Sequence, residues 1–450
     1  MQLTVGEIAG AIGGRLLGDP DLAVASWHTD SRLVVPGGAF FALRGAEADG
    51  HAYLSQAALN GASVVVVERG APALATGATS VVRVGDTWEA LYALAREVLR
   101  RVRPVVVGIT GSNGKTSTKE LCAAALGVRH RVHRTAGNLN TETGLPLTVL
   151  GLEPGHEVAV LEMGMQAPGD IARLAALARP SIGVVTSIGS VHAQSFPDGR
   201  DGIAREKGGL LEALPESGLA VINADGPYAG VLAARTAAPV ARYGFDGPVD
   251  AAGLRGEDYR QLPGGGVCFT ARGWPVRLRL EGRHQAQNAL GALLVARRLG
   301  VGLGEAAAAM AEVETANRLQ RRAVQGGWTL VDDSYNASPE SMRAAFSTVR
   351  GMGRSGRLLA VLGEMRELGA GAEAAHREIG DLAARTFERI AVLDLGWGAV
   401  LAQAAGAELL PDRDAALRWV RANARAGDLV LVKASHGVAL DRLTEALLAC

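Results

Sequence analysis

The sequence is poor in lysine. Only four of its 46 lysine and arginine residues are lysines, at positions 115, 119, 207 and 433. A chain that otherwise uses arginine is expected to keep lysine where a compact ammonium or a modifiable amine cannot be replaced by guanidinium. Lys207 and Lys433 are therefore candidate functional residues, with a surface-loop lysine as the alternative at Lys433. Lys119, beside Glu120, is interpreted as a solvated helix residue.

Other scarcities exclude whole classes of protein. No run of 18 apolar residues is present, so no transmembrane helix and no membrane partner are expected. The N-terminal MQLTVGEIAG lacks the basic and apolar regions of a signal peptide. The formal net charge is +0, so the composition gives no sign of a nucleic-acid partner.

The three cysteines, Cys122, Cys268 and Cys450, are far apart and odd in number. They predict reduced, incidental thiols and a cytoplasmic protein. A hydrophobic content of 48% and a charged content of 20% are ordinary for a globular chain. The length of 450 residues corresponds to about three domains.

Residues 105–120, VVVGITGSNGKTSTKE, predict a phosphate-binding loop. An apolar strand is followed by spaced glycines, then by Lys115 and Thr116 at the start of a helix, which is the order of such loops. Glycines let backbone N–H groups wrap an anion, and the helix points its positive end at the same anion. Lys115 is expected on the β/γ-phosphates and the Thr116 hydroxyl on Mg²⁺.

The loop is a variant, because Ile109 stands where the strict pattern G-x-x-x-x-G-K-[ST] has glycine. The chain instead has G-x-x-G-x-x-G-K-T. The alternative interpretation is a glycine-rich turn with a chance Gly-Lys-Thr. The preceding strand and the three spaced glycines favour the nucleotide interpretation.

Strands alternate with helices along the chain, which predicts an α/β protein with mostly parallel sheets. We expect a small α/β N-terminal domain (1–85), a central P-loop ATPase-like domain (86–316) and a C-terminal Rossmann-like domain (317–450). Strands are expected at 157–162, 182–188, 358–362 and 429–432, an antiparallel hairpin at 265–281 and a helix at 285–299. No G-x-G-x-x-G pattern is present, which argues against a dinucleotide site.

Polar residues follow the predicted strands, at the edge where open α/β sheets bind ligands. Glu162 ends a strand after the P-loop, as a Mg²⁺-holding carboxylate does. His192 lies just beyond the next strand, where the alternative is a packing or surface histidine. Residues 27–54 carry polar loops that could grip a nucleotide-sugar, with ordinary turn chemistry as the alternative.

The motifs taken together resemble the Mur ligase family in order and spacing. The resemblance rests on GITGSNGKTSTKE, GNLNTETGLPLT, LEMG, SIGSVHAQSF, AREKGG, HQAQNALGA, NRLQRR, DDSYNASPESM, LGEMRELG and LVKASHG. It covers essentially the whole chain, and the DDSYNA-type motif is its most specific part. The segment DSR…FFALRG…DGH resembles the uridine-nucleotide-binding domain of family members.

The resemblance implies an ATP-dependent amide ligase of peptidoglycan precursor synthesis. GNLN…GLPLT and DDSYNASPESM most resemble the members that add D-alanyl-D-alanine to UDP-MurNAc-tripeptide. In that reaction ATP phosphorylates the tripeptide carboxylate, and the dipeptide amine attacks the acyl phosphate. The implied cofactors are ATP and two Mg²⁺, and the family further suggests a monomer.

The same resemblance implies roles for individual residues. Lys115, Lys207 and His192 would be catalytic, and Lys207 would be carbamylated by CO₂. The implied metal ligands are Thr116, Glu162, His192 and carbamylated Lys207. The implied ATP-binding residues are Thr110, Gly111, Ser112, Asn113, Gly114, Lys115, Thr116, Asn288, Arg318 and Asp333. Substrate would be held by Ser31, Arg32, Asn138 and Thr141.

Some positions depart from the family pattern: Gln285 for asparagine, Asn317 for glycine, Gly209 for glutamate and His436 for arginine. They put in doubt the details of the adenine pocket and the role of the Lys433 loop. The alternatives to the predicted function are another Mur-like ligase, either of another Mur step or similar to a folylpolyglutamate synthase, and a non-catalytic P-loop nucleotide-binding module. The uridine-nucleotide-like segment argues against the folate enzyme, and retention of Lys115 and Glu162 argues against a degenerate module.

Overall fold

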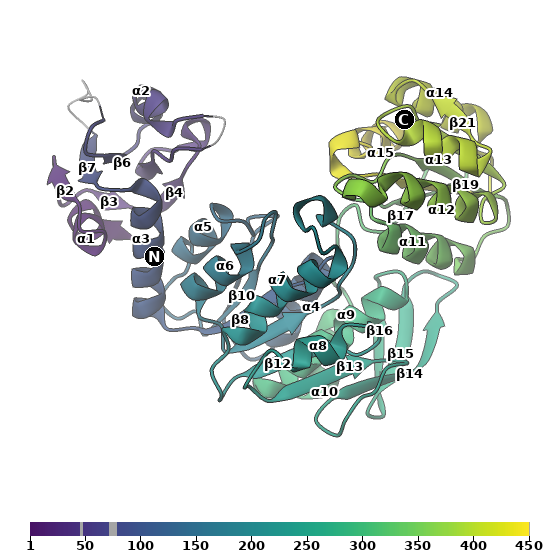
Figure 1. Cartoon of the computed structure of the whole chain (residues 1–450), viewed down its shortest axis with the longest axis horizontal. Helices are drawn as coiled ribbons and strands as arrows, with labels where there is room; N and C mark the ends of the chain where they lie inside the picture. Colours follow the sequence, from purple (N-terminus) through teal and green to yellow (C-terminus); the bar gives the residue numbers. More distant parts are fainter. Residues whose placement is uncertain (46–47, 72–78, 450) are drawn as a thin grey trace. The chain divides into compact units, whose positions relative to one another are not determined.

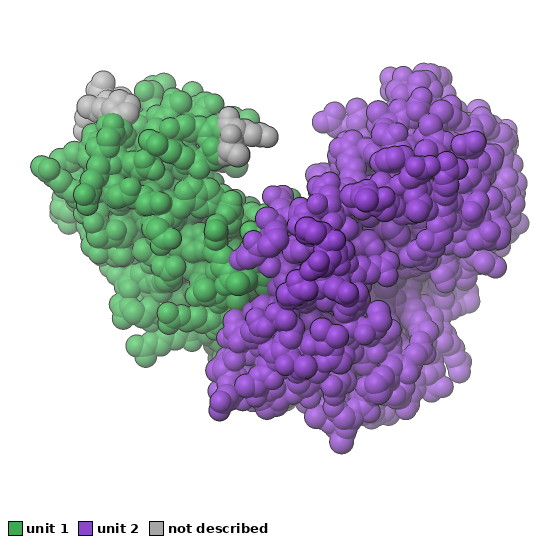
Figure 2. All heavy atoms as spheres, in the orientation of Figure 1, with its two compact units in different colours: residues 1–108, 130–164, 170–181 green, residues 109–129, 165–169, 182–450 purple. Residues whose placement is uncertain are grey.

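The fold was analysed in a computed structural model that describes residues 1–45, 48–71 and 79–449. The chain forms two compact units (Figure 2). Unit 1 comprises residues 1–108, 130–164 and 170–181, and unit 2 comprises residues 109–129, 165–169 and 182–450. Cys450 and part of the predicted 27–54 segment (46–47) lie outside the described residues.

Unit 1 contains a five-stranded sheet of order β2-β7-β6-β5-β4, in which only β2 runs antiparallel to its neighbour. The strands are β2 (Arg15–Leu17), β4 (Ser26–His28), β5 (Gly38–Phe41), β6 (Val64–Glu68) and β7 (Ser80–Val84). A small antiparallel pair joins β1 (Leu3–Thr4) to β3 (Ala23–Val24). The associated helices are α1 (Val5–Ala11), η1 (Ser31–Leu33), η2 (Gly50–Tyr53), α2 (Leu54–Leu59) and α3 (Thr87–Val102).

The rest of unit 1 is built around β10 (Val158–Glu162), which runs parallel to β9 (Val132–Arg134). All five residues of β10 are buried, so the strand is a continuous apolar run that ends on a carboxylate. Its helices are α5 (Gly144–Leu150) and α6 (Asp170–Ala178). β8 (Val105–Thr110) begins in unit 1, and its last two residues belong to unit 2.

The first sheet of unit 2 follows the order β11-β12-β13-β14-β15-β16. Its first four strands are parallel, and β14, β15 and β16 form an antiparallel extension. The strands are β11 (Ile182–Val185), β12 (Leu219–Asn223), β13 (Val240–Gly244), β14 (Leu254–Gln261), β15 (Val267–Ala271) and β16 (Trp274–Leu278). The helices are α4 (Lys115–Leu126), η3 (Ala193–Ser195), α7 (Arg200–Glu212), α8 (Ala229–Ala233), α9 (Arg283–Arg298) and α10 (Leu303–Met310).

The second sheet of unit 2 has the order β17-β18-β22-β19-β20-β21, and only β17 is antiparallel to its neighbour. Figure 1 shows it in green and yellow, among its helices. The strands are β17 (Gln320–Ala323), β18 (Thr329–Asp332), β19 (Leu358–Leu362), β20 (Arg389–Leu393), β21 (Glu408–Leu410) and β22 (Leu429–Lys433). The helices are α11 (Pro339–Gly351), η4 (Gly369–Gly371), α12 (Ala372–Ala384), α13 (Gly398–Ala405), α14 (Arg413–Asn423), η5 (His436–Val438) and α15 (Asp441–Leu448).

Both faces of this sheet are covered, because successive strand side chains point to opposite faces. Leu358, Ala360 and Leu362 pack with residues of α11, α12 and α13, whereas Leu359 and Val361 pack with residues of α14 and α15. Such double burial explains the nearly continuous apolar composition of the strands. Because β18 and β22 are parallel neighbours, their carboxyl ends lie at the same edge of the sheet.

The predicted α/β fold with parallel sheets is confirmed, as are the 265–281 hairpin and the helix near 285–299. Two predictions are wrong. The strand expected at 182–188 ends at Val185, because residues 186–189 bond to the P-loop instead. Lys119 is not solvated but fully buried, beside Glu120 at 3.1 Å. The boundaries 1–85, 86–316 and 317–450 stay a prediction.

The start of β22 is tied to the start of β19 by Asp428, and we expect its loss to destabilise the protein. The buried Asp428 carboxylate accepts hydrogen bonds from the Arg357 backbone N–H (2.7 Å), the Arg357 guanidinium (2.6 Å) and the Arg425 N–H (3.0 Å). Asp428→Ala leaves these donors without their acceptor. It should lower the free energy of unfolding, measured by urea denaturation, by about 2 kcal/mol.

Glu408→Ala is the matched control, since Glu408 pairs with Arg389 on exposed side chains of the same sheet at 2.6 Å. An exposed pair contributes less than about 1 kcal/mol. Equal destabilisation by the two substitutions would contradict a special role for Asp428.

Candidate active site

The predicted phosphate loop joins β8 to α4 in unit 2. Gly111 and Gly114 have φ values of 152° and 87°, which side-chain-bearing residues rarely adopt. A Cβ at Gly111 would collide with the Thr186 hydroxyl, and one at Gly114 with the Asn288 amide. The Lys115 ammonium donates to the Gly111 carbonyl at 2.8 Å, so it lies over the loop. These contacts hold the backbone in the shape that an anion cradle needs.

Residues after β11 brace this loop from one side. The Thr186 N–H donates to the Thr110 carbonyl at 3.0 Å, and the Thr186 hydroxyl donates to the Asn113 carbonyl at 2.6 Å. The Asn113 N–H donates to the Ser187 hydroxyl at 3.0 Å. The Gly189 N–H donates to the Ser112 hydroxyl at 2.8 Å. The bracing fixes the loop through backbone atoms and short hydroxyls.

Helix α9 contributes Asn288, which is 6% exposed. Its side-chain amide nitrogen donates to the side-chain Oε1 of the buried Gln285 at 3.0 Å. Gln285 thus orients Asn288, although the family pattern has asparagine at that position. The amide nitrogen of Asn113 is 3.3 Å from the Ser338 hydroxyl at the start of α11, so the second sheet also reaches the loop.

Asp333 follows β18 and faces Lys433 at the end of β22. The Lys433 ammonium lies 2.7 Å from the Asp333 carboxylate and donates to the Asn336 carbonyl at 2.7 Å. Lys433 is 1% exposed, so its interpretation as a surface-loop lysine is wrong. Burial raises the pKa of Asp333, and the charges of Lys433 and Arg318 oppose that rise.

Arg318 bridges the second sheet to the P-loop. Its guanidinium donates to the Thr116 hydroxyl at 3.0 Å and lies 4.1 Å from the Tyr335 ring centroid. The Tyr335 ring in turn stacks on His436 at 5.8 Å. The next residue, Leu319, donates its N–H to Asp333 at 3.2 Å. Arg318 is therefore held from two directions.

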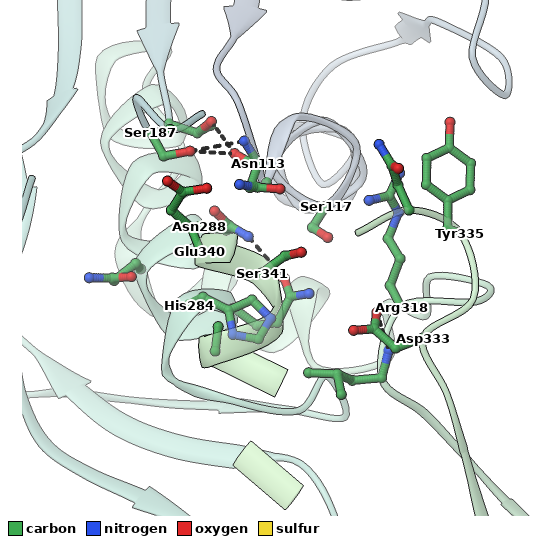
Figure 3. A pocket seen from close by; sticks show the side chains of 18 of the residues that line it. Asn113, Ser117, Ser187, His284, Asn288, Arg318, Asp333, Tyr335, Glu340 and Ser341 are labelled. Atoms are coloured by element: carbon green, nitrogen blue, oxygen red, sulfur yellow. Dashed lines mark hydrogen bonds between the residues drawn. The ribbon is translucent and has the colours of Figure 1, made fainter. Parts of the chain in front are cut away.

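Several of these residues line one cavity of about 210 Å³, shown in Figure 3. Five predicted ATP-binding residues line it: Asn113, Gly114, Asn288, Arg318 and Asp333. His284 also lines the cavity. Desolvation and the charge of Lys433 lower its pKa to about 4, so the imidazole is neutral at neutral pH. The cavity combines an anion cradle, a cation and a carboxylate, which suits a nucleotide.

Lys207 lies in α7 and is 1% exposed. Burial and the charge of Lys115 lower the pKa of Lys207 well below its usual value, which favours the neutral amine. Among the described residues, His192 pairs with Glu367 and not with Lys207. Its Nδ1 lies 2.5 Å from the Glu367 carboxylate, and that hydrogen bond lowers the pKa of Glu367.

Glu162 belongs to unit 1, at the end of β10, and is 2% exposed. Its carboxylate accepts a hydrogen bond from the Asn140 amide at 2.7 Å, and its N–H donates to the Thr135 hydroxyl at 2.9 Å. The predicted metal ligands are thus divided between the units, since Thr116, His192 and Lys207 belong to unit 2. Within the described ranges, no group of three His, Cys, Asp or Glu residues is gathered as a ready metal site.

The four predicted substrate residues also belong to unit 1. Ser31 is 5% exposed, and its carbonyl accepts a hydrogen bond from Asn60 at 2.9 Å. Arg32 is exposed and pairs with Asp30 at 2.6 Å. Asn138 is exposed, and Thr141 lies before α5 with its hydroxyl 3.2 Å from that of Thr143. Their substrate roles stay a prediction.

Sequence reasoning missed several residues that the structure places at these sites. They are Thr186, Ser187, Glu340, Tyr335 and Asn140. Asn140 lies inside the GNLN motif, between the predicted residues Asn138 and Thr141. Spacing alone does not show which amide faces the Glu162 carboxylate. Thr186 and Ser187 were not identified because the sequence predicts a strand over 182–188, which would place them within the sheet.

Comparison with known families finds three models along the chain. Mur ligase family, catalytic domain matches residues 24–98, Mur ligase middle domain matches 109–296, and Mur ligase, glutamate ligase domain matches 317–436. Among the described residues, no helix has the length and apolar character needed to span a membrane.

Curated relatives match over the full length. UDP-N-acetylmuramoyl-tripeptide–D-alanyl-D-alanine ligase of Mycobacterium tuberculosis is 37% identical, over 100% of this chain and 98% of the relative. The enzymes of the same name from Bacillus subtilis and Escherichia coli are 34% and 31% identical, with coverage of at least 98% of each chain.

Solved structures agree with these relatives. MurF from Acinetobacter baumannii superposes with a TM-score of 0.89 at 26% identity, covering 100% of this chain and 99% of that chain. MurF ligase from Thermotoga maritima in complex with ADP has a TM-score of 0.83 at 29% identity, covering 95% and 97%.

Replacing Lys433 tests whether its ion pair organises the nucleotide cavity. Lys433→Met should remove the ammonium that holds both Asp333 and the Asn336 carbonyl, leaving a buried carboxylate without its nearest cation. We expect the dissociation constant for ADP, measured by isothermal titration calorimetry, to rise about tenfold or more, a loss of about 1.4 kcal/mol or more.

Arg377→Met removes the same charge from an exposed pair on α12 and should leave ADP affinity unchanged. Lys433→Arg should not restore binding, because a guanidinium is larger and needs more acceptors in the same space. Normal ADP affinity in Lys433→Met would contradict the assigned role.

Proposed function

We propose that this chain, which belongs to the Mur ligase family, joins D-alanyl-D-alanine to UDP-N-acetylmuramoyl-tripeptide at the expense of ATP. The observation that carries the proposal is full-length similarity, at 31–37% identity, to ligases named for this reaction. The cavity of unit 2 supports it, because the P-loop, α9 and the edge of the second sheet converge there.

The first step transfers a phosphoryl group. The terminal carboxylate of the tripeptide attacks the γ-phosphorus of ATP, the bond to the β-phosphate oxygen breaks, and ADP leaves. The backbone of residues 110–114 and the Lys115 ammonium neutralise charge on the transferred group. Positioning and charge neutralisation suffice, because no covalent bond to the protein forms.

The second step forms the amide bond. The amine nitrogen of D-alanyl-D-alanine attacks the acyl-phosphate carbon, a tetrahedral intermediate forms, and phosphate leaves with the C–O bonding electrons. The amine loses its proton in the process. The products are the pentapeptide precursor, ADP and phosphate.

We assign the adenosine end of ATP to the part of the cavity that is lined by Asn288 and Asp333. Asn288 offers amide groups for adenine, and the Asp333 carboxylate offers acceptors for ribose hydroxyls. Arg318, supported by Tyr335, adds positive charge beside the phosphates. Asp333 follows β18 and Arg318 precedes β17, so the proposed nucleotide site combines the P-loop with segments that flank the second sheet.

Magnesium is expected with ATP, and the donor chemistry of the predicted ligands suits it. Thr116 and the buried Glu162 supply oxygen donors, which Mg²⁺ prefers. When bound, the ion would neutralise charge on the phosphates. We further propose a second Mg²⁺ with His192 among its ligands.

Lys207 is proposed to carry a carbamate. Its neutral amine, favoured by burial and by Lys115, is the form that reacts with CO₂. The new N–C bond turns an amine into an anion with two oxygen donors and releases one proton.

We further propose a cytoplasmic monomer whose unit 1 holds UDP-MurNAc-tripeptide through Ser31, Arg32, Asn138 and Thr141.

The reaction can be tested by phosphate release. Release should require ATP, UDP-MurNAc-tripeptide and D-alanyl-D-alanine together. Lys115→Ala should lower kcat/KM at least about a hundredfold, because a preorganised donor to the transferred group is lost. Arg385→Ala, an exposed arginine on the same unit, serves as the charge-matched control. Release without the dipeptide at the full rate would contradict the proposed ligation.

The carbamate can be observed directly with ¹³C-bicarbonate. Wild-type protein should show a carbamate carbon resonance that Lys207→Gln lacks. The signal should fade as the pH falls through the lowered pKa of Lys207, because protonation removes the reactive amine. Short carboxylates should partly restore activity to Lys207→Ala. Active wild-type protein without the resonance would contradict this proposal.

A further inference from the structure

A second cavity of unit 2 lies beside the nucleotide cavity and has no role in the proposed reaction. It measures about 470 Å³ and lies between β16, the β14–β15 turn, β17 and the connection that precedes β17. Arg318 and Leu319 line both cavities. We call it the arginine pocket, after Arg277, Arg279, Arg321 and Arg322, which line it together with Arg318.

The pocket carries an excess of positive charge. Four arginines other than Arg318 face two glutamates, Glu281 and Glu314. Arg279 pairs with Glu312 at 2.5 Å and with Glu314 at 3.4 Å on exposed side chains. In the described parts of the chain, Arg277 and Arg322 have no ion-pair partner, and Arg322 donates only to the Gln320 amide oxygen at 3.0 Å. The excess is local, since the whole chain has a formal net charge of +0.

Several buried polar atoms in the wall of the pocket also lack hydrogen-bond partners. Thr315 is 6% exposed, and its hydroxyl makes no hydrogen bond within the described structure. Glu281 Oε1 and Arg321 Nη1 form an ion pair at 3.5 Å, and neither atom makes a hydrogen bond within the described structure. Burial raises the pKa of Glu281, which lowers the cost of protonating it beside an anion. Buried polar atoms rarely lack a hydrogen bond, and a bound water or ion is one way in which such an atom is satisfied.

The connection between the cavities is conformationally constrained. Asn317 and Leu319 have φ values of 57° and 53°, on either side of Arg318. Leucine rarely adopts this conformation, which costs of order 1 kcal/mol or more and persists only where neighbours hold it. The Arg318 guanidinium donates to the Thr116 hydroxyl at the start of α4, and Arg321 and Arg322 line the arginine pocket. Because Arg318 lines both cavities, a ligand in the arginine pocket would lie against the same connection that positions Arg318 beside Thr116.

We propose that the arginine pocket binds a phosphate-bearing small molecule with at least two negative charges, and that its occupancy alters nucleotide affinity through the 317–319 connection. Guanidinium forks match phosphate oxygens in paired hydrogen bonds. The volume exceeds that of the nucleotide cavity, which suits an anion larger than a single phosphate. Binding itself does not depend on the proposed ligase reaction.

Pyrophosphate is the probe, titrated calorimetrically into full-length protein saturated with ADP so that the P-loop is occupied. Wild-type protein should bind it with a one-site isotherm. The double variant R277Q/R322Q should raise its dissociation constant at least tenfold, and R354Q/R385Q should leave it within twofold. Arg354 and Arg385 are exposed and remove the same charge elsewhere in unit 2. No binding by wild-type protein, or equal loss in both double variants, would overturn the site.

The coupling is tested by the dissociation constant for ADP with and without pyrophosphate. Simple competition at the P-loop affects wild-type protein and R277Q/R322Q alike, whereas coupling appears only in wild-type protein. We expect at least a threefold difference between them, with the reciprocal effect on pyrophosphate binding. Identical behaviour of the two proteins would overturn the coupling. Normal ADP affinity of R277Q/R322Q without pyrophosphate verifies its folding, and ligase activity is not needed for either readout.

Discussion

The buried pair of Asp333 and Lys433 is the interaction on which the nucleotide cavity depends. Removing both charges from water is costly, and their attraction repays that cost only with further hydrogen bonds. Those bonds are present: the Leu319 N–H donates to Asp333, and Lys433 donates to the Asn336 carbonyl. The pair therefore joins three segments, namely the connection before β17, the loop after β18 and the end of β22.

The geometry follows from strand order. β18 and β22 are adjacent and parallel, with Asp332 opposite Val432. The residues that follow, Asp333 and Lys433, must then emerge side by side at the same edge. Because Asp333 also holds Leu319, the position of Arg318 beside Thr116 is a consequence of the sheet. The contact between Arg318 and Thr116 thus depends on strand pairing within the second sheet.

Much of the fold could be predicted, because apolar runs such as Leu358–Leu362 mark buried parallel strands almost residue by residue. The P-loop was equally accessible, since its chemistry is local in sequence. Contacts between segments that are distant in the sequence could not be predicted. The bracing by Thr186 and Ser187 requires β11 to stop at Val185, yet residues 186–188 are as compatible with a strand as those before them. The pairing of His192 with Glu367 joins two loops that no periodicity relates.

The scarcity of lysine gains a physical explanation from burial. Lys119, Lys207 and Lys433 are at most 1% exposed. A buried guanidinium must satisfy five N–H donors, whereas an ammonium needs three. At Lys433 two acceptors at 2.7 Å take most of that demand. At Lys207 the surroundings favour a neutral amine, a state that arginine does not reach in proteins. Arginine is suited to the surface and to the cavity mouths of this protein. It cannot replace lysine where a buried cation must be small or must be able to lose its proton.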